Sequence, residues 1–104
     1  MLVQIHTDKN IEGGSRFSEF FSNEIKNELA RFDEIVTRIE VHVSDENGNK
    51  AGQKDKKCVI EARVEKKQPF AVTATADSPE KAFFEALEKI QRVLDTTLDK
   101  IKEH

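Results

Sequence analysis

Residues 38–43 read RIEVHV, and this alternation indicates the fold class. Single polar residues separate Ile39, Val41 and Val43, which is typical of a strand with one buried face and one solvated face. In residues 17–32, apolar side chains instead recur every three or four positions, as they do along one stripe of an amphipathic helix. The chain therefore changes from helical to strand periodicity within a few residues.

We predict this first helix over residues 15–32. Ser15 is the expected N-cap, because its hydroxyl can accept a hydrogen bond from a backbone N–H that the first turn leaves unpaired. Ahead of the helix, the apolar side chains of Leu2, Val3 and Ile5 predict a first strand.

Two further alternating segments follow, at residues 57–65 and 70–76. A turn-forming sequence precedes each of them, since residues 45–52 are rich in Asp, Asn and Gly, and Gln68-Pro69 interrupts the alternation. Three half-buried strands on short connections indicate an antiparallel meander.

A second helix is predicted from Ser78 to about Lys102. Ser78 suits the N-cap, Pro79 the first helical position and Glu80 the first turn. The length of this helix is roughly 37 Å at about 1.5 Å per residue, whereas a domain of this size has a radius of gyration of about 13 Å. We therefore expect its last turns to extend beyond the sheet.

The order of the predicted elements is βαβββα, which places the chain in the α+β class. Each strand has one apolar face and each helix one apolar stripe, so the simplest packing lays both helices on one face of a four-stranded sheet. The opposite face of the sheet is then polar. A chain of 104 residues is expected to form one domain, covering residues 1–104.

The composition excludes several classes of protein. The chain has 17 basic and 20 acidic side chains, and a formal net charge of −3 is not that of a globally basic nucleic-acid binder. One cysteine excludes an internal disulfide and a four-cysteine metal site, and a reducing compartment follows. The first residues show neither a basic leader nor an apolar signal segment, and no stretch is apolar enough to span a membrane. We expect a cytoplasmic protein without a membrane partner.

A search for catalytic residues yields none. His6, His42 and His104 are scattered along the chain, with His42 on the wet face of its strand, and neither a nucleophile-elbow serine nor a phosphate-binding glycine loop is present. Cys58 is in phase with the core positions of its strand and is interpreted as a small core residue rather than a reactive thiol. We therefore predict no enzyme, no metal ligand, no cofactor and no small-molecule substrate.

Charge is distributed unevenly along the chain. Residues 1–49 hold five basic and ten acidic side chains, a net charge of −5, whereas residues 50–67 hold seven basic and three acidic ones, a net charge of +4. Such a cationic zone can dock phosphates by releasing counterions. Alternatively, its lysines protect strand ends against edge-to-edge aggregation. Phe20 and Phe84, each beside a core phenylalanine, are interpreted as a widening of the apolar helix faces.

Five segments together carry a family resemblance: VQI at residues 3–5, LARFDEI at 29–35, IEVHVS at 39–44, CVIEAR at 58–63, and the final helix over 82–104. In this order they resemble the ribosome hibernation-promoting factor family, also called protein Y or sigma-54 modulation proteins. The stretch SDEN at residues 44–47 is similar to one subgroup of that family.

The resemblance implies a βαβββα fold related to double-stranded RNA-binding domains, and no enzymatic activity. It implies binding to ribosomal RNA (16S-type rRNA) in the decoding region of the small ribosomal subunit. Four basic positions of the last helix match the family: Lys89, Arg92, Lys100 and Lys102. We add five lysines of the cationic zone as further candidate phosphate contacts: Lys54, Lys56, Lys57, Lys66 and Lys67.

One departure from the family concerns the first helix. Typical members place lysines just before the leucine that corresponds to Leu29, where this chain has Asn27 and Glu28. The resemblance therefore implies that this chain binds RNA more weakly, and with greater sensitivity to salt, than a more basic relative would.

We predict a ribosome-associated factor that binds the small subunit and damps translation under stress or in stationary phase. The alternative is a protein-interaction module of the same fold with weak or no RNA binding, which could be a homodimer. The acidic first half of the chain favours this alternative.

Overall fold

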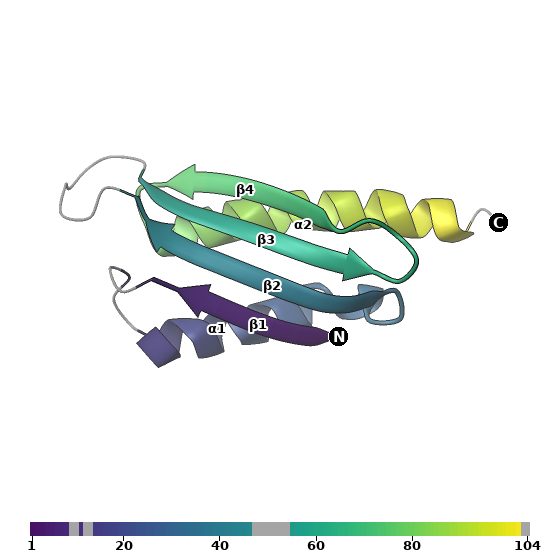
Figure 1. Cartoon of the computed structure of the whole chain (residues 1–104), viewed down its shortest axis with the longest axis horizontal. Helices are drawn as coiled ribbons and strands as arrows, with labels where there is room; N and C mark the ends of the chain where they lie inside the picture. The colour runs from purple at the N-terminus through teal and green to yellow at the C-terminus, as the bar shows by residue number, and fades with distance from the viewer. Residues whose placement is uncertain (9–10, 12–13, 47–54, 103–104) are drawn as a thin grey trace.

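The computed structural model describes residues 1–8, 11, 14–46 and 55–102. It consists of four strands, two α-helices and one short 3₁₀ helix, η1 (Figure 1). In chain order these are β1 (Leu2–Thr7), α1 (Gly14–Glu28), η1 (Ala30–Phe32), β2 (Val36–Asp45), β3 (Lys56–Val64), β4 (Phe70–Ala76) and α2 (Pro79–Lys102). The predicted βαβββα order is confirmed.

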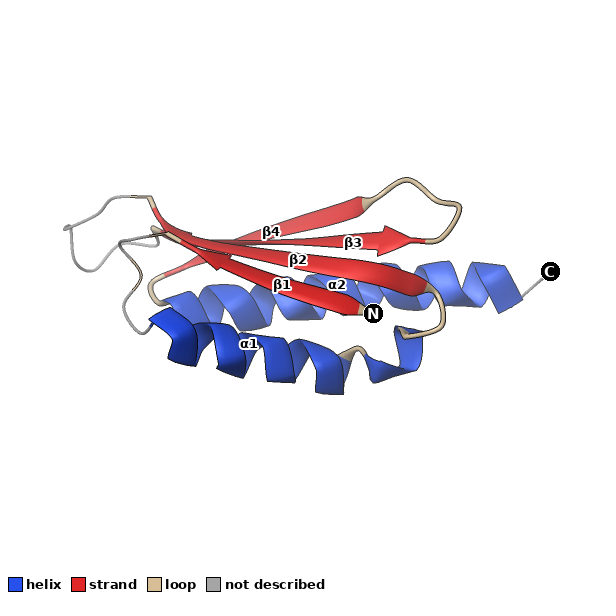
Figure 2. Ribbon diagram, turned by 60° about the horizontal axis from the view of Figure 1, so that its bottom comes forward, coloured by secondary structure: helices blue, strands red, loops and turns tan. Residues whose placement is uncertain are grey.

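The four strands form one sheet in the order β1-β2-β3-β4. The antiparallel meander predicted for the last three strands is confirmed, and β1 joins β2 in parallel. A parallel pair requires a crossover connection, which α1 supplies. Both helices lie on the same face of the sheet, as predicted (Figure 2).

The first helix differs from its prediction at both ends. It begins at Gly14, so Ser15 lies inside the first turn instead of at the N-cap, and it ends at Glu28 instead of residue 32. After Leu29 the chain tightens into η1, in which Phe32 N–H donates to Leu29 O at 3.0 Å. Leu29 and Phe32 are both fully buried. Apolar positions three residues apart suit an α-helix and a 3₁₀ turn equally, so periodicity could not show where one replaced the other.

The second helix agrees with its prediction. Ser78 caps it, since its Oγ accepts a hydrogen bond from Lys81 N–H at 3.2 Å, and Pro79 occupies the first helical position. The last turns of α2 extend past the end of the sheet, as predicted (Figure 1). Among the described residues, no helix is both long enough and apolar enough to cross a membrane.

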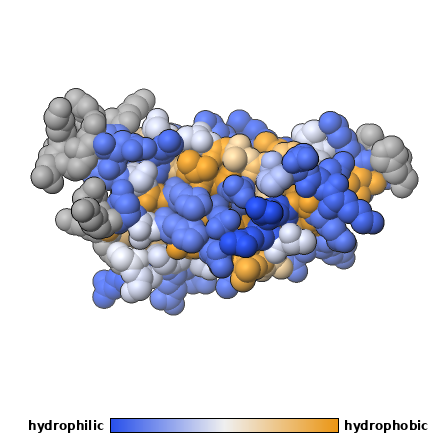
Figure 3. All heavy atoms as spheres, in the orientation of Figure 1, coloured by the Kyte–Doolittle hydropathy of each residue, from blue (hydrophilic) through white to orange (hydrophobic). Residues whose placement is uncertain are grey.

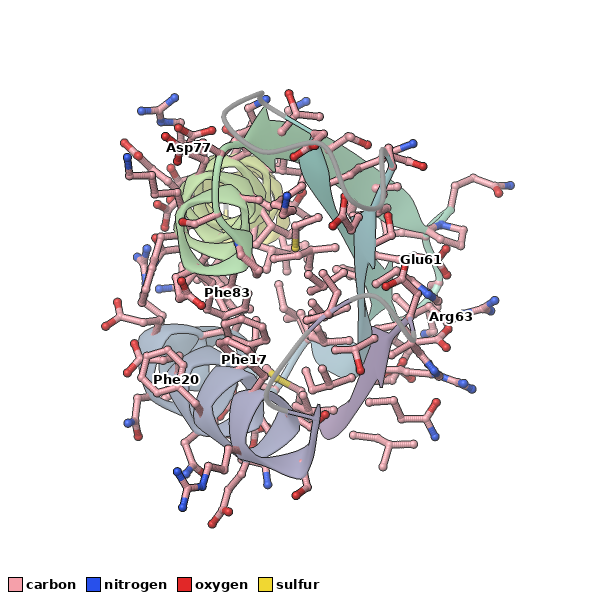
Figure 4. All side chains as sticks on the ribbon, turned by 90° about the vertical axis from the view of Figure 1, so that its left-hand side faces the viewer. Phe17, Phe20, Glu61, Arg63, Asp77 and Phe83 are labelled. Carbon is pink, nitrogen blue, oxygen red and sulfur yellow. The ribbon has the colours of Figure 1, made fainter. Side chains whose placement is uncertain are left out.

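The core lies between the sheet and the two helices. Ile39, Val41 and Val43 are fully buried there, and Cys58 is a core residue as predicted. Figure 4 shows Phe83 between the helices and the sheet, whereas Glu61 and Arg63 point away from the opposite face. That open face carries mainly hydrophilic side chains (Figure 3), so the predicted division into a buried and a solvated face is confirmed.

Candidate functional site

The fold divides the cationic zone of residues 50–67 between the two ends of the sheet. Lys56 and Lys57 begin β3, whereas Lys66 and Lys67 follow its last residue. Nine residues of extended chain span about 30 Å, and the start of β3 and the turn between β3 and β4 accordingly lie at opposite ends of the sheet (Figure 1). Lys54 lies outside the described residues. The +4 segment is therefore not one continuous patch.

At the first of these ends, Lys56 is held by two acidic side chains. Its Nζ lies 2.7 Å from Asp55 Oδ1 and 3.5 Å from Asp45 Oδ2. The side chains of Asp55 and Asp45 are only 2 % and 5 % exposed. The hydrogen bond to Asp55 raises the pKa of Lys56 above its ordinary value. A phosphate group would have to displace these carboxylates, so Lys56 is less available for phosphate binding than Lys57.

Lys57 has a looser partner at the same end. Its Nζ lies 3.6 Å from Glu46 Oε1, and both side chains are substantially exposed. An exposed pair of this length is weak, so Lys57 can exchange its partner for a phosphate at low cost.

At the other end, three candidate cations from distant parts of the chain meet at one groove. Lys67, from the turn before β4, and Arg92 and Lys100, from the second half of α2, line a groove of about 650 Å³. The uncharged residues of its lining are Gln68, Phe70, Val93, Thr96 and Thr97. We call this the cationic groove.

The geometry of the turn brings Lys67 to the cationic groove. Lys66 adopts a left-handed conformation with φ 65°, and Lys67 N–H then donates to Val64 O at 3.1 Å. Lys66 and Lys67 also line a smaller neighbouring cavity together with Ile101 of α2. Glu34 and Glu65 also line this cavity, so the turn and the end of α2 meet at one end of the molecule without making it uniformly basic.

The cations of the cationic groove differ in their engagement. Arg92 Nη2 contacts Glu88 Oε1 at 2.7 Å across one helical turn, and both side chains are well exposed. Lys67 and Lys100 are exposed, and neither forms an ion pair in the part of the chain that the structure describes. Lys102 is exposed in the last turn of α2. An anion entering the groove therefore meets cations that are free or bound to one surface carboxylate.

Lys89, which is also a candidate phosphate contact, forms a hydrogen bond with the sheet. Its Nζ donates to the backbone carbonyl of Thr73 at 2.8 Å. Thr73 belongs to β4, which is an outer strand of the sheet. Lysines near an outer strand are a common means of preventing its pairing with another chain, and this hydrogen bond occupies one carbonyl of β4. Of the four helix positions, Arg92 and Lys100 line the cationic groove and Lys89 does not.

Two histidines that are far apart in the sequence, His6 and His42, lie side by side in the structure. His6 of β1 and His42 of β2 are register partners, and their rings stack with centroids 4.6 Å apart and planes 13° apart. His6 Nε2 lies 3.2 Å from Glu40 Oε1. Partial burial opposes ionisation of Glu40, but the hydrogen bond from His6 and the charge of Arg38 hold its pKa below the ordinary value. The sequence shows that both histidines alternate with apolar residues, but it does not give the register that pairs them.

The structure is thus an α+β fold of βαβββα order with a cationic groove at one end. Comparison with protein families gives a match over residues 4–102 to the family described as Sigma 54 modulation protein / S30EA ribosomal protein. The chain belongs to this family, a class of ribosome-associated factors. The resemblance read from the sequence is thereby confirmed.

Two solved structures share the fold. One is a ribosomal subunit interface protein from Coxiella burnetii, with a TM-score of 0.69, 11 % identity, and coverage of 95 % of this chain and 99 % of that chain. The other is the N-terminal domain of Protein Y from Thermus thermophilus, with a TM-score of 0.65, 13 % identity, and coverage of 93 % and 99 %. No curated protein sequence matches significantly.

Proposed function

We propose that the protein binds the small ribosomal subunit through rRNA phosphates, acts in the cytoplasm, and damps translation under stress or in stationary phase. Membership of a ribosomal family supports a ribosomal partner. The cationic groove is the observation that supports RNA as the partner. Lys67, Arg92 and Lys100 converge there, although the chain as a whole has a net charge of −3.

The groove combines two features that suit an RNA backbone. Its basic side chains can replace the counterions of phosphates, which makes binding favourable and dependent on salt. Phe70 and Val93 add apolar lining against which a sugar or a base can pack. Because the rest of the chain is acidic, we expect the protein to approach RNA with this end first.

Sedimentation with purified small subunits at increasing salt tests the proposal. The informative variant replaces Lys67, Arg92 and Lys100 with Gln. Its control replaces Arg16, Lys26 and Lys81, three exposed cations elsewhere, and changes the net charge equally. We expect the first variant to bind much more weakly and its plot of log affinity against log salt to lose about 2 to 3 units of slope. The control should keep most of the affinity.

Two results would contradict this proposal. One is a wild-type protein that stays at the top of the gradient at low salt. The other is an equal loss in both triple variants, which would assign binding to net charge instead of the cationic groove.

Damping of translation requires a separate measurement. A protein that acts by occupying a site, without catalysis, should inhibit translation in vitro in proportion to its molar ratio to ribosomes. Inhibition that saturates far below one protein per ribosome would point to a catalytic effect instead.

A second candidate function, a protein-interaction module, has one supporting surface. Phe20 and Phe84 are 43 % and 42 % exposed, and their rings meet edge to face with centroids 6.1 Å apart. Light scattering after size exclusion tests self-association: a dimer that the double variant Phe20→Ser, Phe84→Ser disperses would support this candidate, and a monomer would oppose it.

A further inference from the structure

We propose that His6, His42 and Glu40 form a binding site for a divalent transition-metal ion on the open face of the sheet, with Zn²⁺ as the best match. This inference does not depend on the proposed ribosomal function. The sequence predicted no metal ligands because His6 and His42 are far apart along the chain. In the fold they are register partners on neighbouring strands.

The site is built from the parallel pairing of β1 with β2. His6 and His42 are opposite each other in this pair, and Glu40 lies two residues before His42, so all three side chains stand on the solvated face. One potential ligand atom from each residue lies within 4.8 Å of the other two. In the described part of the chain, this is the one cluster of its kind.

The distance between two of the three ligand atoms is close to the one that a metal ion imposes. Two ligands bonded at about 2.1 Å to a tetrahedral ion are roughly 3.4 Å apart. His6 Nε2 and Glu40 Oε1 are already 3.2 Å apart. Because the His42 side chain is exposed, it can turn toward the other two ligand atoms without moving the strand.

The type of ligand selects the type of ion. Two imidazoles and one carboxylate match the three protein ligands of zinc sites that leave the fourth position to water. Mg²⁺ and Ca²⁺ instead prefer all-oxygen surroundings. The nitrogen lone pairs of the stacked rings lie in parallel planes, so the His42 ring has to turn out of the stack before both imidazoles can coordinate one ion.

Arg38 opposes a cation at this site and so provides a specific test. Its Nη2 lies 3.2 Å from the same Glu40 oxygen that contacts His6, and 2.8 Å from Gln4 Oε1. Replacing Arg38 with Gln removes a positive charge and a competing hydrogen-bond donor. The variant should therefore bind the metal ion more tightly than the wild type.

Calorimetric titration of the tag-free protein with zinc chloride tests the proposal. We expect the wild type to bind one Zn²⁺ per chain. His6→Gln and His42→Gln should each lower the affinity at least about tenfold, the smallest loss typical of substitutions around a bound metal. Arg38→Gln should raise the affinity. His104→Gln is the matched control, because it removes the remaining histidine of the sequence, and it should bind like the wild type.

Circular dichroism of each variant shows whether the fold is retained, as expected for substitutions on the solvated face. NMR spectra of the imidazole nitrogens provide a second readout, in which Zn²⁺ should shift His6 and His42 together and leave His104 in place. The proposal is wrong if the wild type binds no Zn²⁺, or if His104→Gln loses as much affinity as His6→Gln. Loss of ribosome binding would not affect it.

Discussion

Phe21 of α1 and Phe83 of α2 are both fully buried, and their rings stack with centroids 4.2 Å apart and planes 23° apart. This contact joins two helices that otherwise pack mainly on the sheet, α1 against β1 and α2 against β3 and β4. It therefore connects the two halves of the core.

Replacing Phe83 with Ala should lower the free energy of unfolding by about 3–5 kcal/mol, because the substitution removes buried apolar surface and leaves a cavity. The control is Phe84→Ala, the neighbouring residue, whose side chain is 42 % exposed; its loss should be much smaller. Urea denaturation followed by circular dichroism measures both. Equal losses in the two variants would show that the stacked pair has no special role.

Lys56→Gln should lower the melting temperature more than Lys57→Gln does. Lys56 contacts two carboxylates that are almost completely buried, whereas the exposed pair of Lys57 and Glu46 is worth less than about 1 kcal/mol. Differential scanning calorimetry of both variants at neutral pH checks the comparison. A greater effect of Lys57→Gln would contradict it.

The contribution of Lys56 should also depend on pH. Its pKa is higher in the folded protein than the ordinary 10.5, so the stabilisation is complete below that pH and is lost as the pH rises through the folded pKa. The difference in melting temperature between wild type and Lys56→Gln should therefore be constant at neutral pH and shrink under strongly alkaline conditions.

The thiol of Cys58 should be unreactive in the folded protein. Burial raises its pKa from 9.0 to about 12, and the thiolate is the reactive form. At pH 8 an aromatic disulfide reagent should label the thiol only after urea unfolds the chain. Because Cys58 is the sole cysteine, the absorbance change reports this site alone. Rapid labelling in the absence of urea would contradict the prediction.

Glu88→Gln should strengthen binding to small subunits. The substitution removes the carboxylate that contacts Arg92 at 2.7 Å and leaves that guanidinium available to a phosphate. We expect affinity at low salt to rise about two- to fivefold, equivalent to the ~0.5–1 kcal/mol of one surface charge interaction. Glu19→Gln on α1 makes the same change in net charge and is the control. Equal gains in both variants would assign the effect to net charge alone.

Local sequence patterns account for most of the fold. Alternation at Ile39, Val41 and Val43 predicted a half-buried strand because side chains of a strand point to opposite faces in turn. The Ser78-Pro79 start of α2 was predictable for a similarly local reason, since capping involves neighbours within one turn. The end of α1 was not, because the burial of Leu29 and Phe32 is compatible with two kinds of helix.

The candidate sites depend on contacts between distant residues. Lys67 and Lys100 were both candidates from the sequence, but the pattern grouped Lys67 with Lys56, from which the length of β3 separates it. Lys56 is held by Asp45, its partner across β2 and β3, and by Asp55, its neighbour in the chain. The charge count had placed Asp45 in the acidic segment and Asp55 in the cationic one, so it did not show that both contact Lys56.

The periodicity of this chain was sufficient for the order of its elements and their buried faces, because both depend on which residue types recur at which spacing. Its family was indicated separately, by the resemblance of five segments in their order along the chain. The partners of the charged and histidine side chains were set in three dimensions. The parallel register of β1 on β2 places His6 on His42, and the packing of α2 against β4 brings Arg92 and Lys100 to Lys67. Such partners follow from how whole elements pack, which spacing within one element does not encode.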